Sequence, residues 1–138
     1  MPTRTVYTFG MRIRAPLEAV RTRVEVALKA EGFGVLTEID VQATLKAKLG
    51  VEREAFVILG ACNPQLAHRA LEADPSVGAL LPCNVVLREE AGETIIEVMD
   101  PLAVLGIVDD PRIGPVATEA RERLERAIAA LETGLPRG

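Results

Sequence analysis

The sequence predicts an α+β protein with a mainly antiparallel sheet of about five strands and helices packed on one face. Stretches of strand character follow one another with few regular strand–helix alternations, which is typical of an antiparallel sheet. Two of these stretches flank a short turn at residues 90–93, as in a β-hairpin. The chain then ends in a long amphipathic stretch, which favours a C-terminal helix. Its 138 residues match the size of one domain, and we expect residues 1–138 to form a single one.

The first third of the chain predicts a strand, a helix and a second strand. Residues 5–13 alternate between apolar and polar positions, and those expected on one face are Thr5, Tyr7, Phe9, Met11 and Ile13. Pro16 then opens a helix that ends at Gly32. The period of two returns over residues 35–42, which indicates the second strand.

The middle of the chain predicts short helices around one buried strand. Residues 42–49 favour a short helix ended by Gly50, although an irregular loop would also fit. The continuous apolar run 56–59 is typical of a strand buried on both faces. Asn63-Pro64 and Asp74-Pro75 each combine a capping residue with a proline at the first helical position, and they open two helical segments.

The last third predicts a hairpin and the long helix. The hairpin strands are expected at 84–89 and 94–99, and a segment punctuated by proline and glycine follows at 100–115. The last helix is expected from Pro115 or Val116 to Leu131, ended by Gly134 and Pro136.

The central strands carry apolar residues at successive positions, so both faces of the sheet need cover. Two helices can cover only one face. The other must be covered by the 100–115 segment or by a second copy of the chain, so we expect a homo-oligomer, most simply a dimer.

Composition excludes several classes of partner. A net charge of −4 and four aromatic residues disfavour nucleic-acid binding, which uses basic surfaces and aromatic platforms. No apolar stretch is long enough to span a membrane, and the N-terminus has no signal-peptide pattern, so we expect a cytoplasmic protein. Two cysteines are too few for a secreted disulfide framework and should remain thiols.

The sequence also disfavours several chemistries. One histidine cannot form a His-rich metal centre, and the single serine, Ser76, is poorly placed for a catalytic triad with His68. No phosphate-binding or dinucleotide-binding glycine motif occurs. We therefore predict no metal site and no cofactor.

Two similar segments remain as candidates for a site, one containing Cys62-Asn63 and the other Cys83-Asn84. Cys62 precedes a predicted helix N-terminus, where free amides and the helix dipole would stabilise a thiolate and lower the pKa of the thiol. The alternative is that both cysteines are small buried hydrophobic residues, with Asn63 a helix cap and Asn84 a turn residue.

Two further residues could join this site. His68 would act as a base only if its helix brings the imidazole within hydrogen-bond reach of Cys62; otherwise it is an exposed helix residue. Asp100 could add a carboxylate at the same end of the sheet, or could simply cap a helix that starts at Pro101.

These motifs carry a resemblance to a known family. The runs 32–41, 59–64, 80–85 and 100–101 resemble the bacterial and archaeal family known as domain of unknown function 302, over nearly the whole chain. The resemblance implies a compact two-layer α+β fold with a curved antiparallel sheet. It implies no reaction and no catalytic residue.

Three functions fit these observations. The first is a small-ligand binding or sensing module, whose aliphatic pocket ends at Cys62, Asn63, Cys83 and Asn84. The second is a thiol-dependent enzyme or redox protein that uses Cys62, alone or with Cys83. The third is a structural or interaction protein that acts through a homodimer surface.

Overall fold

The structure, a computed structural model, describes residues 1–134. Within them one open sheet runs in the order β1-β2-β6-β5-β4-β3, and each neighbouring pair is antiparallel. The strands are β1 (Pro2–Arg4), β2 (Thr8–Ile13), β3 (Gly34–Asp40), β4 (Phe56–Cys62), β5 (Cys83–Glu90) and β6 (Glu93–Met99). The helices are α1 (Leu17–Ala30), α2 (Val41–Leu49), α3 (Pro64–Ala73), α4 (Pro101–Val104) and α5 (Ile113–Gly134), with 3₁₀ helices η1 (Pro75–Leu80) and η2 (Leu105–Ile107).

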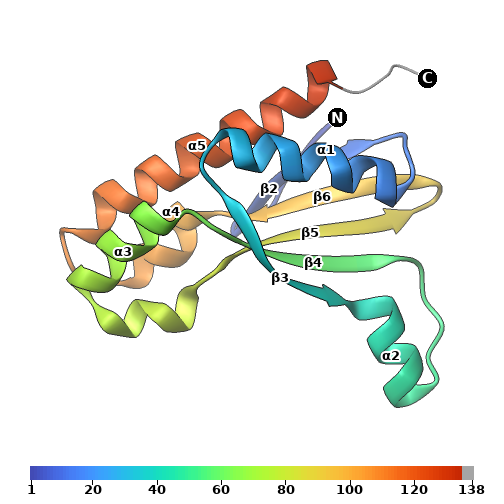
Figure 1. The fold of residues 1–138 in the computed structure, drawn as a ribbon, viewed down its shortest axis with the longest axis horizontal. Helices are drawn as coiled ribbons and strands as arrows, with labels where there is room; N and C mark the ends of the chain where they lie inside the picture. Colours follow the sequence, from blue (N-terminus) through green and yellow to red (C-terminus); the bar gives the residue numbers. More distant parts are fainter. Residues whose placement is uncertain (135–138) are drawn as a thin grey trace.

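Helices α1 and α5 pack against each other and cover one face of the sheet (Figure 1). The strand residues on this face alternate with residues on the other face and are almost all apolar. Those that are buried include Phe9, Met11, Val57, Leu59, Val85, Leu87, Ile96 and Val98. The predicted α+β class, with helices on one face and a long C-terminal helix, is therefore confirmed.

The strand count and several element boundaries differ from the prediction. The structure adds β1, a strand of three residues, which is too short to show a periodic pattern. Tyr7 lies outside β2 and is exposed, so the predicted alternation begins only at Thr8. Residues 41–49 do form a helix. Helix α5 starts at Ile113 and continues beyond Leu131 to Gly134, and Pro136 lies outside the described residues.

The segment 100–115 does not cover the second face of the sheet. Its short helices α4 and η2 pack against α5, beside the helix layer (Figure 1). The first of the two expected covers, the 100–115 segment, is therefore not used by the described residues. The other expected cover is a second copy of the chain.

Strand β3 and helix α2 form an arm that projects from the body of the protein (Figure 1). We call residues 34–56 the arm, and none of them is buried. Helix α2 contacts mainly β3 and β4. Its ends are locally specified, because the Asp40 side chain accepts a hydrogen bond from the Ala43 amide at 2.9 Å and Gly50 adopts a left-handed conformation. The arm thus has defined local structure but no core of its own.

The contact between β2 and β6 yields a prediction at Gly10. A Cβ atom at this position would lie 1.7 Å from the backbone oxygen of Ile96, so Gly10→Ala must push the two strands apart. Overpacking of this kind costs about 1–3 kcal/mol or more in the free energy of unfolding, and urea denaturation should show such a loss. Gly106→Ala is the control, because nothing lies within 4 Å of its Cβ position. Equal stability of the two variants would contradict this account.

Candidate functional site

Three of the six predicted site residues come together where β4, α3 and β5 meet. Cys62 ends β4, Asn63 caps α3, and Cys83 begins β5, in register with Ala61. Asn63 is buried, and its side-chain oxygen accepts a hydrogen bond from the Leu66 amide at 3.2 Å. The capping role expected of Asn63 is therefore confirmed.

These three residues line a small apolar cavity between α3, α5 and the sheet. Its volume is about 30 Å³, and small side chains leave the space open. A water molecule needs roughly 10–15 Å³ on this measure, so the cavity holds about two waters, far less than the roughly 300–1,000 Å³ of typical ligand pockets. Its lining comprises Phe33, Ala61, Cys62, Asn63, Leu66, Ala67, Ala70, Leu81, Pro82, Cys83, Leu105, Val116 and Ala120.

Both cysteines are free thiols with raised pKa values. Burial raises the pKa of Cys83 to about 11, and the nearby Cys62 adds to the effect. Burial also raises the pKa of the half-buried Cys62. This direction is opposite to the one predicted from the helix N-terminus. Fewer amides are free there than the prediction assumed, because the Asn63 side chain accepts from Leu66 and Pro64 has no N–H group.

The other three predicted residues lie apart from this cavity. Asn84 is exposed on the opposite face of the sheet from Cys83, its neighbour in β5. His68 is exposed on α3, with its Nε2 atom 3.8 Å from Glu72 on the same helix. Asp100 is buried, caps α4 through the Leu102 amide at 2.9 Å, and pairs with Arg121. None of the three lines the cavity between the cysteines.

Arg121 is a largely covered charge that the sequence did not reveal: 11% of its side chain is exposed. Its guanidinium lies 2.5 Å from the Asp100 carboxylate and 4.4 Å from the centre of the Phe9 ring. Its Nε atom forms an ion pair with Glu125 Oε1 at 2.5 Å and makes no hydrogen bond. An exposed arginine in the same predicted helix would give the same sequence pattern, so the position of Arg121 could not be predicted. The pair fastens α4 to α5 and leaves the Asp100 carboxylate already occupied.

An open groove of about 700 Å³, which no sequence pattern predicts, lies between α1 and the edge strand β3. Arg21 on α1 and Glu38 on β3 form a bidentate ion pair beside it. The pair lowers the pKa of Glu38 and raises that of Arg21. Arg21 and Glu38 are thus occupied by each other, whereas Lys29 also lines the groove.

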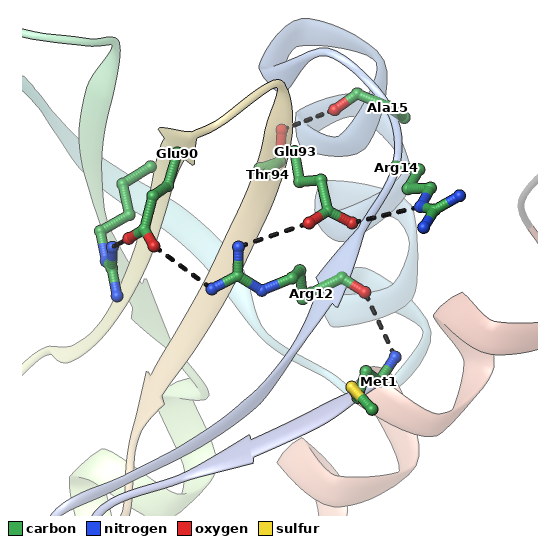
Figure 2. A network of polar contacts seen from close by, with 8 residues as sticks. Met1, Arg12, Arg14, Ala15, Glu90, Glu93 and Thr94 are labelled. Atoms are coloured by element: carbon green, nitrogen blue, oxygen red, sulfur yellow. Dashed lines mark hydrogen bonds and ion pairs between the residues drawn. The ribbon is translucent and has the colours of Figure 1, made fainter.

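One half of the uncovered face of the sheet is ionic. Figure 2 shows Arg12 of β2 contacting Glu90 and Glu93, both at 3.4 Å, with Arg14 beside Glu93. In the same half, Arg88 of β5 contacts Glu97 of β6 at 2.8 Å. Ile95 sits in register between Arg12 and Arg88 and is only 2% exposed. The arginine stems therefore cover this apolar residue, and the ionic half needs no second chain.

The other half of this face is apolar and only partly covered, with the Arg53 guanidinium 5.0 Å from the centre of the Phe56 ring. It is formed by alternate residues of β3, β4 and β5, in register across the strands. Ile39 is 50% exposed, and the other members are partly exposed. We call this set the sheet patch: Ile39, Phe56, Ile58 and Val86.

Two classes of site find no support in the part of the chain that the structure describes. No group of three or more His, Cys, Asp or Glu side chains there could hold a metal ion. Nor is any helix among these residues long and apolar enough to cross a membrane.

Comparison with known proteins agrees with the fold. The family model described as a domain of unknown function, DUF302, matches residues 9–131. The crystal structure of an uncharacterised conserved DUF302 protein from Bacillus stearothermophilus is 32% identical and superposes with a TM-score of 0.83. The match covers 91% of this chain and 98% of that one. No curated protein matches the sequence.

The raised thiol pKa values predict slow alkylation of the native protein. Only the thiolate reacts with iodoacetamide, so at pH 7 neither cysteine should label at the rate of an unperturbed thiol, whose pKa is about 8.5. Cys83, with a pKa of about 11, should label more slowly than Cys62, and both should reach the unperturbed rate in denaturant. Mass spectrometry of the alkylated peptides measures both rates. Rapid labelling of Cys62 below pH 7 would contradict this assignment.

Proposed function

Because the chain belongs to the DUF302 family, whose description assigns no activity, we propose its function from geometry: it is an interaction protein that acts as a homodimer through the uncovered apolar half of its sheet. The observation that carries the proposal is that no residue of the arm is buried, although the arm is regular in structure and contains several large apolar side chains. A second chain would supply the missing cover.

The energetic gain expected from such cover is substantial. Burying a Leu, Ile or Val side chain completely stabilises a protein by about 1.5–3 kcal/mol. The arm exposes Leu36, Ile39, Leu49 and Val51, each by more than two-fifths of its surface. A twofold axis doubles every contact, and the summed gain must exceed the cost of association, about 4–15 kcal/mol, by the roughly 8 kcal/mol that micromolar binding requires.

The ionic half of the face supports the same choice of surface. Its three arginines and three glutamates pair with one another within the chain, and the Arg12 and Arg88 stems already cover Ile95. Removing these exposed pairs from water would cost more than it gains. The favourable surface is therefore confined to the sheet patch and the adjoining arm.

A thiol-dependent reaction has weaker support. A nucleophilic cysteine requires a lowered pKa or an adjacent base, whereas burial raises the pKa of both thiols. The single histidine, His68, is exposed and contacts Glu72 of its own helix. The geometry therefore favours binding over catalysis.

The proposal predicts a dimer that one charge can break. Light scattering at micromolar concentration should give twice the mass of one chain, and Ile39→Lys should raise the dissociation constant at least about 30-fold, because the lost burial exceeds roughly 2 kcal/mol. Leu102→Lys, on the exposed side of α4, is the matched control and should remain dimeric. A wild-type protein that is monomeric at these concentrations would refute the proposal.

A second function, binding of a small ligand, is favoured by one observation: the cavity lies where the two cysteine segments meet. Its small apolar lining suits only a methyl-sized or similar group, so any larger ligand must leave its remaining atoms outside. In this function the cysteines act as neutral, polarisable wall residues, as their raised pKa values favour.

Xenon is a suitable probe of this second function, since apolar cavities bind it. Xenon pressure should shift the methyl NMR signals of Leu66, Val116 and their neighbours in the lining. Ala70→Val should abolish these shifts, because its added methyl groups enter the cavity. If xenon leaves these signals unchanged in the wild-type protein, the cavity admits no apolar group and this function is excluded.

A further inference from the structure

We infer that the groove between α1 and β3 binds an extended peptide segment of another protein. The peptide adds to the sheet as a strand beside β3 and places its C-terminal carboxylate next to Lys29. The groove lies at the edge of the sheet, and its lining includes no member of the sheet patch. This binding surface is therefore distinct from the sheet patch assigned to the homodimer.

Strand β3 offers the main-chain groups that such a peptide needs. It is the last strand of the sheet, and it has seven residues, whereas β1 at the opposite edge has three. In the part of the chain that the structure describes, β3 pairs with β4 alone, so alternate residues point unpaired N–H and C=O groups outward. An added strand satisfies these groups, which is how several peptide-binding domains hold their ligands.

The groove follows this backbone edge. Its lining includes the consecutive residues 32–38, so it runs along the strand itself rather than over one face of the sheet. The opposite wall is α1, whose Arg21, Glu25 and Lys29 recur every four positions and share one side of the helix. The volume of about 700 Å³ lies within the range of roughly 300–1,000 Å³ that is typical of ligand sites. The edge is therefore accessible to a short segment.

Charge specifies which end of the peptide lies where. Arg21 forms ion pairs with Glu25 and Glu38, so three of the four charged side chains in the groove are engaged with one another. The fourth, Lys29, makes no ion pair within the described chain. It belongs to the last turn of α1 and lines the groove together with Gly34, the first residue of β3. A peptide antiparallel to β3 has its C-terminus at this end, where Lys29 can bind the carboxylate.

The β3 strand of a second copy does not suit this edge. The strand carries Glu38 and Asp40 and no basic residue, so pairing two copies edge to edge would bring like charges together. The register with β4 also skips Leu36, and such a bulge opposes pairing with another long, flat strand. The Leu36 side chain is 68% exposed and lines the groove, where it can contact a short peptide. The favoured occupant is therefore a peptide rather than another copy of the chain.

A library of short synthetic peptides with free C-termini tests this binding. Peptides captured by the wild-type protein should bind it in fluorescence anisotropy. The same sequences with an amidated C-terminus should bind about tenfold or more weakly, because a charge-assisted hydrogen bond is lost. Lys29→Glu should weaken binding of the carboxylate peptides at least as much. Lys48→Glu is the matched control and should bind them normally, because Lys48 is an exposed lysine in the last turn of α2 and does not line the groove.

N-methylation of the captured peptides distinguishes strand addition from other modes of binding. Methyl groups on alternate amides block only one edge of an extended peptide, so one of the two alternating series should abolish binding and the other should preserve it. The inference is overturned if the library yields no binders, if amidation or Lys29→Glu leaves binding unchanged, or if both methylated series bind equally well. These outcomes do not depend on oligomeric state, so a monomeric wild-type protein would refute the homodimer and leave the peptide site in place.

Discussion

The width of the helix layer is the constraint on which the rest of the structure depends. Six strands spaced about 4.8 Å apart span roughly 24 Å, whereas two helices packed 8–10 Å apart cover about 20 Å. Helices α1 and α5 therefore cover most of one face, and the edge strand β3 lies at the margin of this layer. It contacts α1, among others through the Arg21–Glu38 ion pair, but it has no buried residue, and helix α2 continues from it into solvent. The apolar core, the cavity and the uncovered arm all follow from this difference between the width of the sheet and the width of the helix layer.

The way in which strands are joined to helices explains why the polar residues at these junctions do not form a reactive centre. Asn63, Asp74 and Asp100 each precede a proline and each accept a backbone amide at the start of a helical segment. Asp100 is further occupied by Arg121. These three side chains look available for chemistry in the sequence, but in the structure each of them caps a helical segment. The cysteines beside them line a largely apolar cavity, where burial disfavours a thiolate.

Local patterns predicted most of the fold, whereas properties that depend on register could not be predicted. Alternation and caps located the longer helices and every strand except β1, whereas η2 was not predicted within the segment 100–115. The cover of Ile95 depends on its register with Arg12 and Arg88, which no single segment encodes. A lowered pKa of Cys62 was one of two alternatives, and it was wrong in direction because burial of the thiol outweighs a helix N-terminus in which Pro64 has no N–H group and the Leu66 amide is used by Asn63. Arg121 was missed because an exposed arginine would give the same pattern.

The absence of buried residues in the arm has a consequence for how its sequence can vary among relatives. A side chain that packs against nothing is free to drift, so in a monomeric protein residues as exposed as Leu36 and Leu49 would be replaced by polar residues as readily as any surface position. Drift would even be favoured, since exposed apolar residues promote aggregation. Retention of apolar residues at these two positions across the family would therefore be an evolutionary record of a contact made with another chain.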